Sequence, residues 1–290
     1  MIWRVLIFAI GAAVVWLAIF RIYPYAHQQL PAVVVLLLLY CMFAYMVIPA
    51  LIRLFRLFIK PNHIPLYVTT GDGWAADPVN IAVVAHSQKQ FIKAMEDAGW
   101  YLADKTTFKS TLREAYSIIF NQSYPRAPFS NLYLFDQPFD LGFQKSANDK
   151  MSARSRHHVR FWEFGTANPA HETTHFKFWH KHLRHLLHPE KKVWIGAAID
   201  DTGPVGIRWR YGQLTHRNNP DTNLERDLII GDLEKANYTK SVEVIQAGKP
   251  FSFRGQTLGN NFVCDGTIKV VGLKKPLVKT ITGRLASKKR

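Results

Sequence analysis

The sequence predicts an α+β protein in which an N-terminal transmembrane helical hairpin precedes one α+β domain with a mixed or antiparallel sheet. Two long apolar stretches open the chain, at residues 2–20 and about 31–54, and each is long enough to cross the roughly 30 Å hydrocarbon core of a bilayer as a helix. Beyond them, strand-like and helix-like segments come in runs instead of alternating strictly, which is typical of α+β folds. About 200 residues remain for the domain, enough for one of ordinary size.

These signals divide the chain into four parts. We expect the hairpin in residues 1–60, a linker rich in proline and glycine in 61–78, the domain in 79–273 and a basic tail in 274–290. A segment at 167–192 interrupts the strand pattern and is interpreted as an insertion into the domain.

The composition of the first part favours a membrane anchor over a cleaved signal peptide. Arg4 is the only charged residue in residues 2–20 and 31–52, and it lies close enough to the chain end to reach the headgroup region. No small-residue cleavage pattern follows the first stretch, and a second one comes directly after it. Arg53, Arg56 and Lys60 follow the second stretch, so the positive-inside rule predicts a multi-pass inner-membrane protein with its soluble domain in the cytoplasm.

Periodicity and capping signals predict the elements of the domain. A buried strand at 80–85 leads to a helix that begins after Ser87 and ends before Gly99, and a second helix covers 107–121. A third helix at 222–236 begins with a capping box formed by Thr222 and Glu225. Strands are expected at 132–135, 141–145, 156–164, 193–200, 208–216 and 242–246, with closing strands in 251–271.

The charge balance indicates an anionic partner. Residues 53–290 carry 35 of the 37 Lys and Arg and all 21 Asp and Glu, a net charge of +14. A domain tethered to a bilayer meets lipid first, so we expect anionic headgroups or a membrane-protein partner. Nucleic acid is disfavoured, because no RRM or zinc-finger signature is present and the basic tail lacks interleaved aromatic residues.

Two further segments fit a membrane surface. The insertion has a helical stripe of apolar side chains on an otherwise basic, histidine-rich segment, which is the composition of an interfacial helix, although the same stripe would also suit packing on the sheet. The tail has seven basic residues and no acidic one. The residues expected at the interface are Phe176, Trp179, Leu183, Leu186, Lys274 and Lys275.

Signatures of common enzymes and cofactors are missing from the sequence. Cys41 and Cys264 form neither a disulfide framework nor a metal-ligand pair. The sequence contains no G-x-S-x-G, H-E-x-x-H, Walker or G-x-G-x-x-G motif. We therefore expect no cofactor and no metal.

Six phrases occur in order along the domain: NIAVVAHSQKQFIKAMEDAGWYLAD, YPRAPFSNLYLF, DLGFQK, RSRHHVRFW, VWIGAAIDD and THRNNPDTNLERD. Together, over roughly residues 80–271, they closely resemble the LssY C-terminal domain family of bacterial proteins. In that family the domain typically follows membrane modules of the DedA or phosphatidic-acid-phosphatase type. Here a two-helix anchor stands in their place and the insertion is added, so the resemblance implies the domain but no reaction.

The phrase RSRHHVRFW provides the candidate anion site. As a strand it places Arg156, His158, Arg160 and Trp162 on one face and His157 on the other, so the two histidines cannot share one metal. Arg156 and Arg160 suit phosphate or carboxylate oxygens, and Arg226 is added as a third anion-binding residue. The alternative is a solvated strand face with ordinary surface arginines.

A hydrolase acting on phosphorylated lipid or glycolipid headgroups is the alternative function. In it, His158 and His216 serve as acid, base or nucleophile, Arg160 stabilises the developing charge and Asp200 orients an imidazole. This site requires His158, His216 and Asp200 to converge. His216 would otherwise be a core histidine with a backbone partner.

Overall fold

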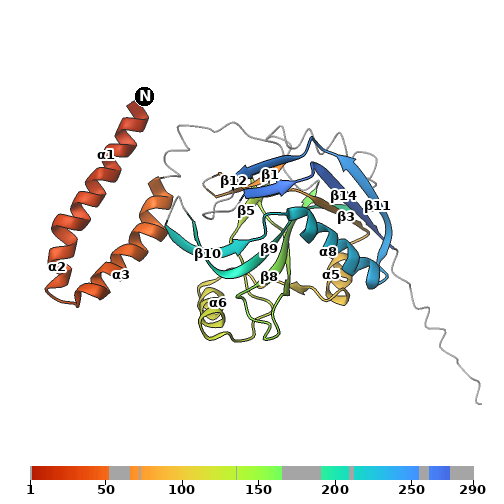
Figure 1. Cartoon of the computed structure of the whole chain (residues 1–290), viewed down its shortest axis with the longest axis horizontal. Coiled ribbons are helices and arrows are strands. Elements are labelled where there is room, and N and C mark those ends of the chain that lie inside the picture. Colours follow the sequence, from red (N-terminus) through yellow and green to blue (C-terminus); the bar gives the residue numbers. More distant parts are fainter. Residues whose placement is uncertain are drawn as a thin grey trace, which may run out of the picture.

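The computed structural model describes residues 2–51, 66–71, 73–134, 136–164, 191–208, 212–254 and 261–274, and side chains are described for most of them (Figure 1). Residues 165–190, which contain most of the predicted insertion at 167–192, and the tail from 275 lie outside these ranges. The expectations for Phe176, Trp179, Leu183, Leu186 and Lys275 therefore concern parts of the chain that are not described.

The chain begins with two apolar helical rods that stand beside the domain (Figure 1). The first comprises α1 (Ile2–Leu17), η1 (Ala18–Ile22) and α2 (Tyr23–His27), and the second comprises α3 (Ala32–Met42) and η2 (Phe43–Val47). Each is long and apolar enough to cross a membrane, and only 11% of each apolar window is buried, unlike a core helix of a soluble protein. The first helix extends beyond the predicted apolar stretch at residues 2–20, because helix continues through Pro24 to His27.

An eight-stranded mixed sheet forms the centre of the domain and confirms the predicted fold class. All its described pairings are antiparallel except that of β14 with β3. The strand order is β11 (Thr239–Gln246), β14 (Thr267–Leu273), β3 (Ile81–Ala85), β9 (Lys192–Arg208), β8 (Arg156–Phe164), β7 (Leu141–Ser146) and β4 (Tyr101–Leu102), with β10 (Gln213–Asn218) also on β9. The strand predicted at 208–216 is divided, since β9 runs to Arg208 and β10 begins at Gln213.

A smaller antiparallel sheet covers one face of the large one. Its order is β2 (Ala75–Pro78), β1 (Tyr67–Thr70), β5 (Leu132–Leu134) and β6 (Gln137–Pro138). Val68, Leu132 and Ile195 meet in the core between the two sheets. The predicted linker at 61–78 is therefore wrong from Leu66 onward, because this segment contributes two strands and buried side chains to the domain. β12 (Phe251–Arg254) and β13 (Asn261–Cys264) form a separate pair.

Helices α5 (Gln88–Asp97) and α8 (Thr222–Lys235) cover the face of the large sheet opposite the smaller sheet, while α6 (Phe108–Phe120) lies at an edge of the domain (Figure 1). The side chain of Ser87 accepts a hydrogen bond from the Gln90 amide, which confirms the predicted start of α5. Phe91 packs on Phe161 and Trp194, with ring centroids 4.8 and 5.0 Å away. Aromatic burial thus fixes α5 on the sheet.

Helix α8 begins differently from the prediction. Its N-cap is Asp221, whose side chain accepts a hydrogen bond from the Asn223 amide, and not Thr222. The Thr222 hydroxyl donates to the Val263 carbonyl, while Glu225 turns toward the sheet. The capping box is therefore not formed, because both side chains bond to other elements.

Candidate functional site

The strand register brings together polar side chains from three neighbouring strands. Lys145 of β7 lies opposite His157 of β8, and His157 lies opposite Asp200 of β9. They share the face that carries Val159 and Phe161, over which α8 packs. The N-terminal part of α8 then adds Glu225 to this group.

His157, Asp200 and Glu225 form what we call the carboxylate–histidine cluster. Nδ1 of His157 lies 2.7 Å from Oε2 of Glu225 and 3.4 Å from Oδ1 of Asp200. The Glu225 side chain is only 2% exposed, whereas those of His157 and Asp200 are 25% and 16% exposed. The cluster is therefore buried at its base and open to solvent at its rim.

Burial and mutual contact set the protonation of this cluster. Burial raises the pKa of Glu225 to about 7, against the opposing effect of the His157 hydrogen bond. Burial also raises the pKa of Asp200, although His157 and a hydrogen bond from the Asn219 side chain counteract it. Burial disfavours the His157 imidazolium, yet the bond to Glu225 and the nearby carboxylate charges leave its pKa raised overall. Burial and the contact between the two side chains thus act in opposite directions on the pKa of each group.

A second ion pair lies beside the cluster. Nζ of Lys145 lies 2.8 Å from Oδ2 of Asp232, and Nε1 of Trp100 donates to the same oxygen at 3.1 Å. Lys145 remains about one-third exposed, so a cationic group borders the open rim.

The other face of β8 carries the predicted anion site. As the alternation predicted, Trp162 lies in one core and Phe161 in the other. The solvated-face alternative is wrong, because Arg156, His158 and Arg160 are each only 4% exposed beneath the smaller sheet and the loop before β5.

Both arginines on this face already hold carboxylates. Nη1 of Arg160 lies 3.0 Å from Oδ2 of Asp77. Arg156 lies 2.8 Å from Glu114 and 3.4 Å from Asp201. These guanidiniums therefore tie β8 to surrounding elements, a structural role that uses the bonding capacity an external anion would need.

Arg226 is buried in a similar network. It lies 2.8 Å from Asp227 and 3.0 Å from Asp265, and it donates to the Thr267 hydroxyl. It connects α8 to the segment before β14.

The proposed catalytic set does not come together in the described residues. His158 lies opposite Ile199 in the register, whereas Asp200 lies opposite His157, so His158 and Asp200 point to opposite faces of the sheet. Arg160 shares the face of His158, and the side chain of His216 lies outside the described part of the chain. His157 and Glu225 were missed as site residues because the register of β8 against β9 cannot be read from the sequence.

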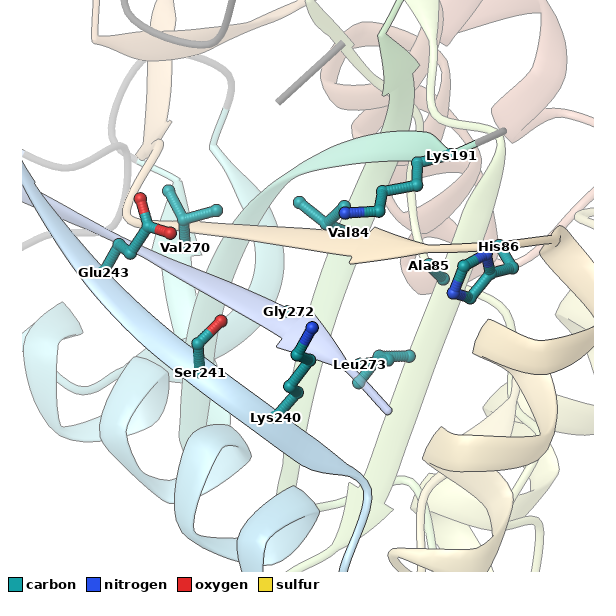
Figure 2. A pocket seen from close by; sticks show the side chains of 10 residues that line it. All are labelled: Val84, Ala85, His86, Lys191, Lys240, Ser241, Glu243, Val270, Gly272 and Leu273. Atoms are coloured by element: carbon teal, nitrogen blue, oxygen red, sulfur yellow. The ribbon is translucent and has the colours of Figure 1, made fainter. Parts of the chain in front are cut away.

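A separate hollow of about 190 Å³ lies over the ends of β3, β11 and β14 (Figure 2). Its polar side chains are those of His86, Lys191, Lys240, Ser241 and Glu243, and Figure 2 shows them around Gly272 and Leu273. We call this feature the basic hollow. The chain continues from its edge at Leu273 directly into the basic segment that begins with Lys274.

Comparison with known proteins identifies the domain. No curated protein and no solved structure matches the chain. A sequence model of the family described as LssY C-terminus matches residues 61–268, which include every strand from β1 to β13 and all three residues of the carboxylate–histidine cluster. The chain therefore belongs to the LssY C-terminal family.

Proposed function

We propose that this protein is anchored in a membrane by residues 2–54 and that its LssY C-terminal domain engages anionic lipid headgroups at the cytoplasmic face of the inner membrane. The observation that carries the proposal is the pairing of two exposed apolar helices with a net charge of +14 on residues 53–290. Anionic lipids attract such a surface, with each lysine or arginine near the bilayer contributing about 1 kcal/mol.

The basic hollow is the described feature best suited to a headgroup phosphate. Lys191 and Lys240 supply two positive charges beside one carboxylate, and the His86 imidazole and the Ser241 hydroxyl add hydrogen-bond donors. Its volume suits a small polar group and not an acyl chain. The basic residues 274–290, which follow the edge of the hollow, would extend the same cationic surface.

Substitution of Lys240 tests this proposal. We expect Lys240→Gln to weaken binding of dihexanoyl phosphatidic acid by about three- to tenfold, since one favourable charge near the phosphate is lost. The measurement is isothermal titration of the full chain in a neutral detergent, with the lipid kept below its micellar concentration. Dihexanoyl phosphatidylcholine serves as the zwitterionic comparison.

The matched control is Lys235→Gln, which removes another exposed lysine, from the end of α8. The proposal predicts tighter binding of phosphatidic acid than of phosphatidylcholine, a loss specific to Lys240→Gln, and weaker binding as salt increases. Equal affinity for both lipids would contradict headgroup recognition. Equal losses in the two lysine variants would contradict the basic hollow as its location.

A further inference from the structure

The geometry points to a divalent metal site formed by His157, Asp200 and Glu225, suited to an ion such as Mn²⁺ or Zn²⁺. One ligand atom from each residue can be chosen so that all three lie within 4.8 Å of one another. One imidazole nitrogen and two carboxylate oxygens match the ligand preferences of these ions. The site is independent of headgroup binding, because it lies on the α8 side of the sheet and its test uses no lipid.

An unsatisfied oxygen at the base of the cluster supports this inference separately. Oε2 of Glu225 contacts His157, but Oε1 is buried and has no hydrogen-bond partner among the described residues. A buried carboxylate oxygen left without a partner is unfavourable by about 1–3 kcal/mol or more. A bound dication would coordinate this carboxylate and balance the two negative charges of Asp200 and Glu225.

The arrangement also resembles a metal site in its rigidity and access. The ligands come from β8, β9 and α8, so regular elements fix all three. The Asn219 side chain bonds to Asp200 and orients it, as outer-shell groups commonly do around metals. Partial exposure of His157 and Asp200 leaves a solvent-facing side, where water or a phosphate oxygen would complete the coordination.

The hydrogen bond between His157 and Glu225 must open to admit the ion. With metal–ligand bonds of about 2.0–2.2 Å, tetrahedral ligand atoms lie roughly 3.4 Å apart. The His157–Asp200 distance is already 3.4 Å, while the 2.7 Å between His157 and Glu225 must lengthen as their hydrogen bond is replaced. Metal ligands bind in their deprotonated forms, so the proton of the hydrogen bond between His157 and Glu225 is released to solvent when the ion binds.

Manganese is the better probe for the test. Residues 171–188 contain six histidines, and such a stretch would bind Zn²⁺ adventitiously. The full chain in detergent is first stripped with EDTA and then titrated with MnCl₂, and free Mn²⁺ is followed by its electron paramagnetic resonance signal. We expect one Mn²⁺ per chain and spin-echo modulation from a single imidazole nitrogen.

Isosteric variants assign the ligands. Glu225→Gln is expected to raise the Kd for Mn²⁺ at least tenfold, while Glu234→Gln, an exposed position on the same helix, leaves it unchanged. If Glu225→Gln does not fold, the less buried Asp200→Asn replaces it, with the same loss expected. Absence of Mn²⁺ binding by the wild-type chain would overturn the inference. Binding that is unaffected in a folded Glu225→Gln or Asp200→Asn variant would do so as well.

Discussion

Arg160→Ala is expected to lower the free energy of unfolding by about 3–5 kcal/mol, because it leaves Asp77 buried without the guanidinium it faces. The two side chains are 5% and 9% exposed, and Nη1 of Arg160 lies 3.0 Å from Oδ2 of Asp77. Arg160 also donates to the Ser130 carbonyl and lies over the Phe129 ring, with Cζ 4.6 Å from its centroid. Urea unfolding of the full chain in detergent, followed by tryptophan fluorescence, measures the loss.

The chain offers a matched control for this change. Arg126 forms an ion pair with Asp104 at 3.0 Å, but its side chain is 51% exposed, so Arg126→Ala should cost less than about 1 kcal/mol. Replacing both partners of the buried pair, with Arg160→Met and Asp77→Leu, should recover much of the stability. If Arg160→Ala cost no more than Arg126→Ala, the buried pair would not hold the two sheets together.

Asn80→Ala is expected to destabilise the fold by about 3–4 kcal/mol, since it removes three buried hydrogen bonds at once. The Asn80 side chain donates to the carbonyls of Ala198 and Thr222 at 3.2 and 2.9 Å, and it accepts from the Ala198 amide at 3.1 Å. Asn80, the residue before β3, is thereby linked to β9, which carries Asp200, and to the first residue of α8, the helix that carries Glu225. The same urea experiment measures the effect.

Two comparisons sharpen the Asn80 prediction. Asn131→Ala, at an exposed loop position, should change the stability by less than about 0.5 kcal/mol. Asn80→Asp keeps an acceptor for the Ala198 amide but loses both donated bonds, so it should be at least as destabilising as the alanine variant. An Asn80→Ala chain as stable as the Asn131→Ala chain would show that α8 is held by its apolar face alone.

Local patterns in the sequence were sufficient to predict much of the fold. Alternation along residues 156–164 assigned Phe161 and Trp162 to opposite faces, and the structure confirms that assignment. Ser87 identified the start of α5 because an N-cap is a local interaction. The family resemblance, which extended over most of the domain, is likewise confirmed.

The candidate site depended on contacts between distant parts of the chain. The pairing of His157 with Asp200 follows from the register of β8 against β9. Between these two strands lie 26 residues that the structure does not describe. Glu225 had a plausible local role in a capping box, but its contact with His157 prevailed. The burial of Arg156 and Arg160 depended on a second sheet whose first strands lay in the predicted linker. Strand register and the packing of distant elements cannot be inferred from the local sequence pattern.

Membrane anchoring is the central claim, because the headgroup proposal depends on a domain held at a bilayer. The most direct measurement is carbonate extraction of membranes that contain the full chain, followed by ultracentrifugation and intact-mass analysis. We predict a chain of 33.3 kDa that stays entirely in the pellet. A full-length chain in the supernatant, or a chain shortened by its first apolar helix, would contradict the two-helix anchor.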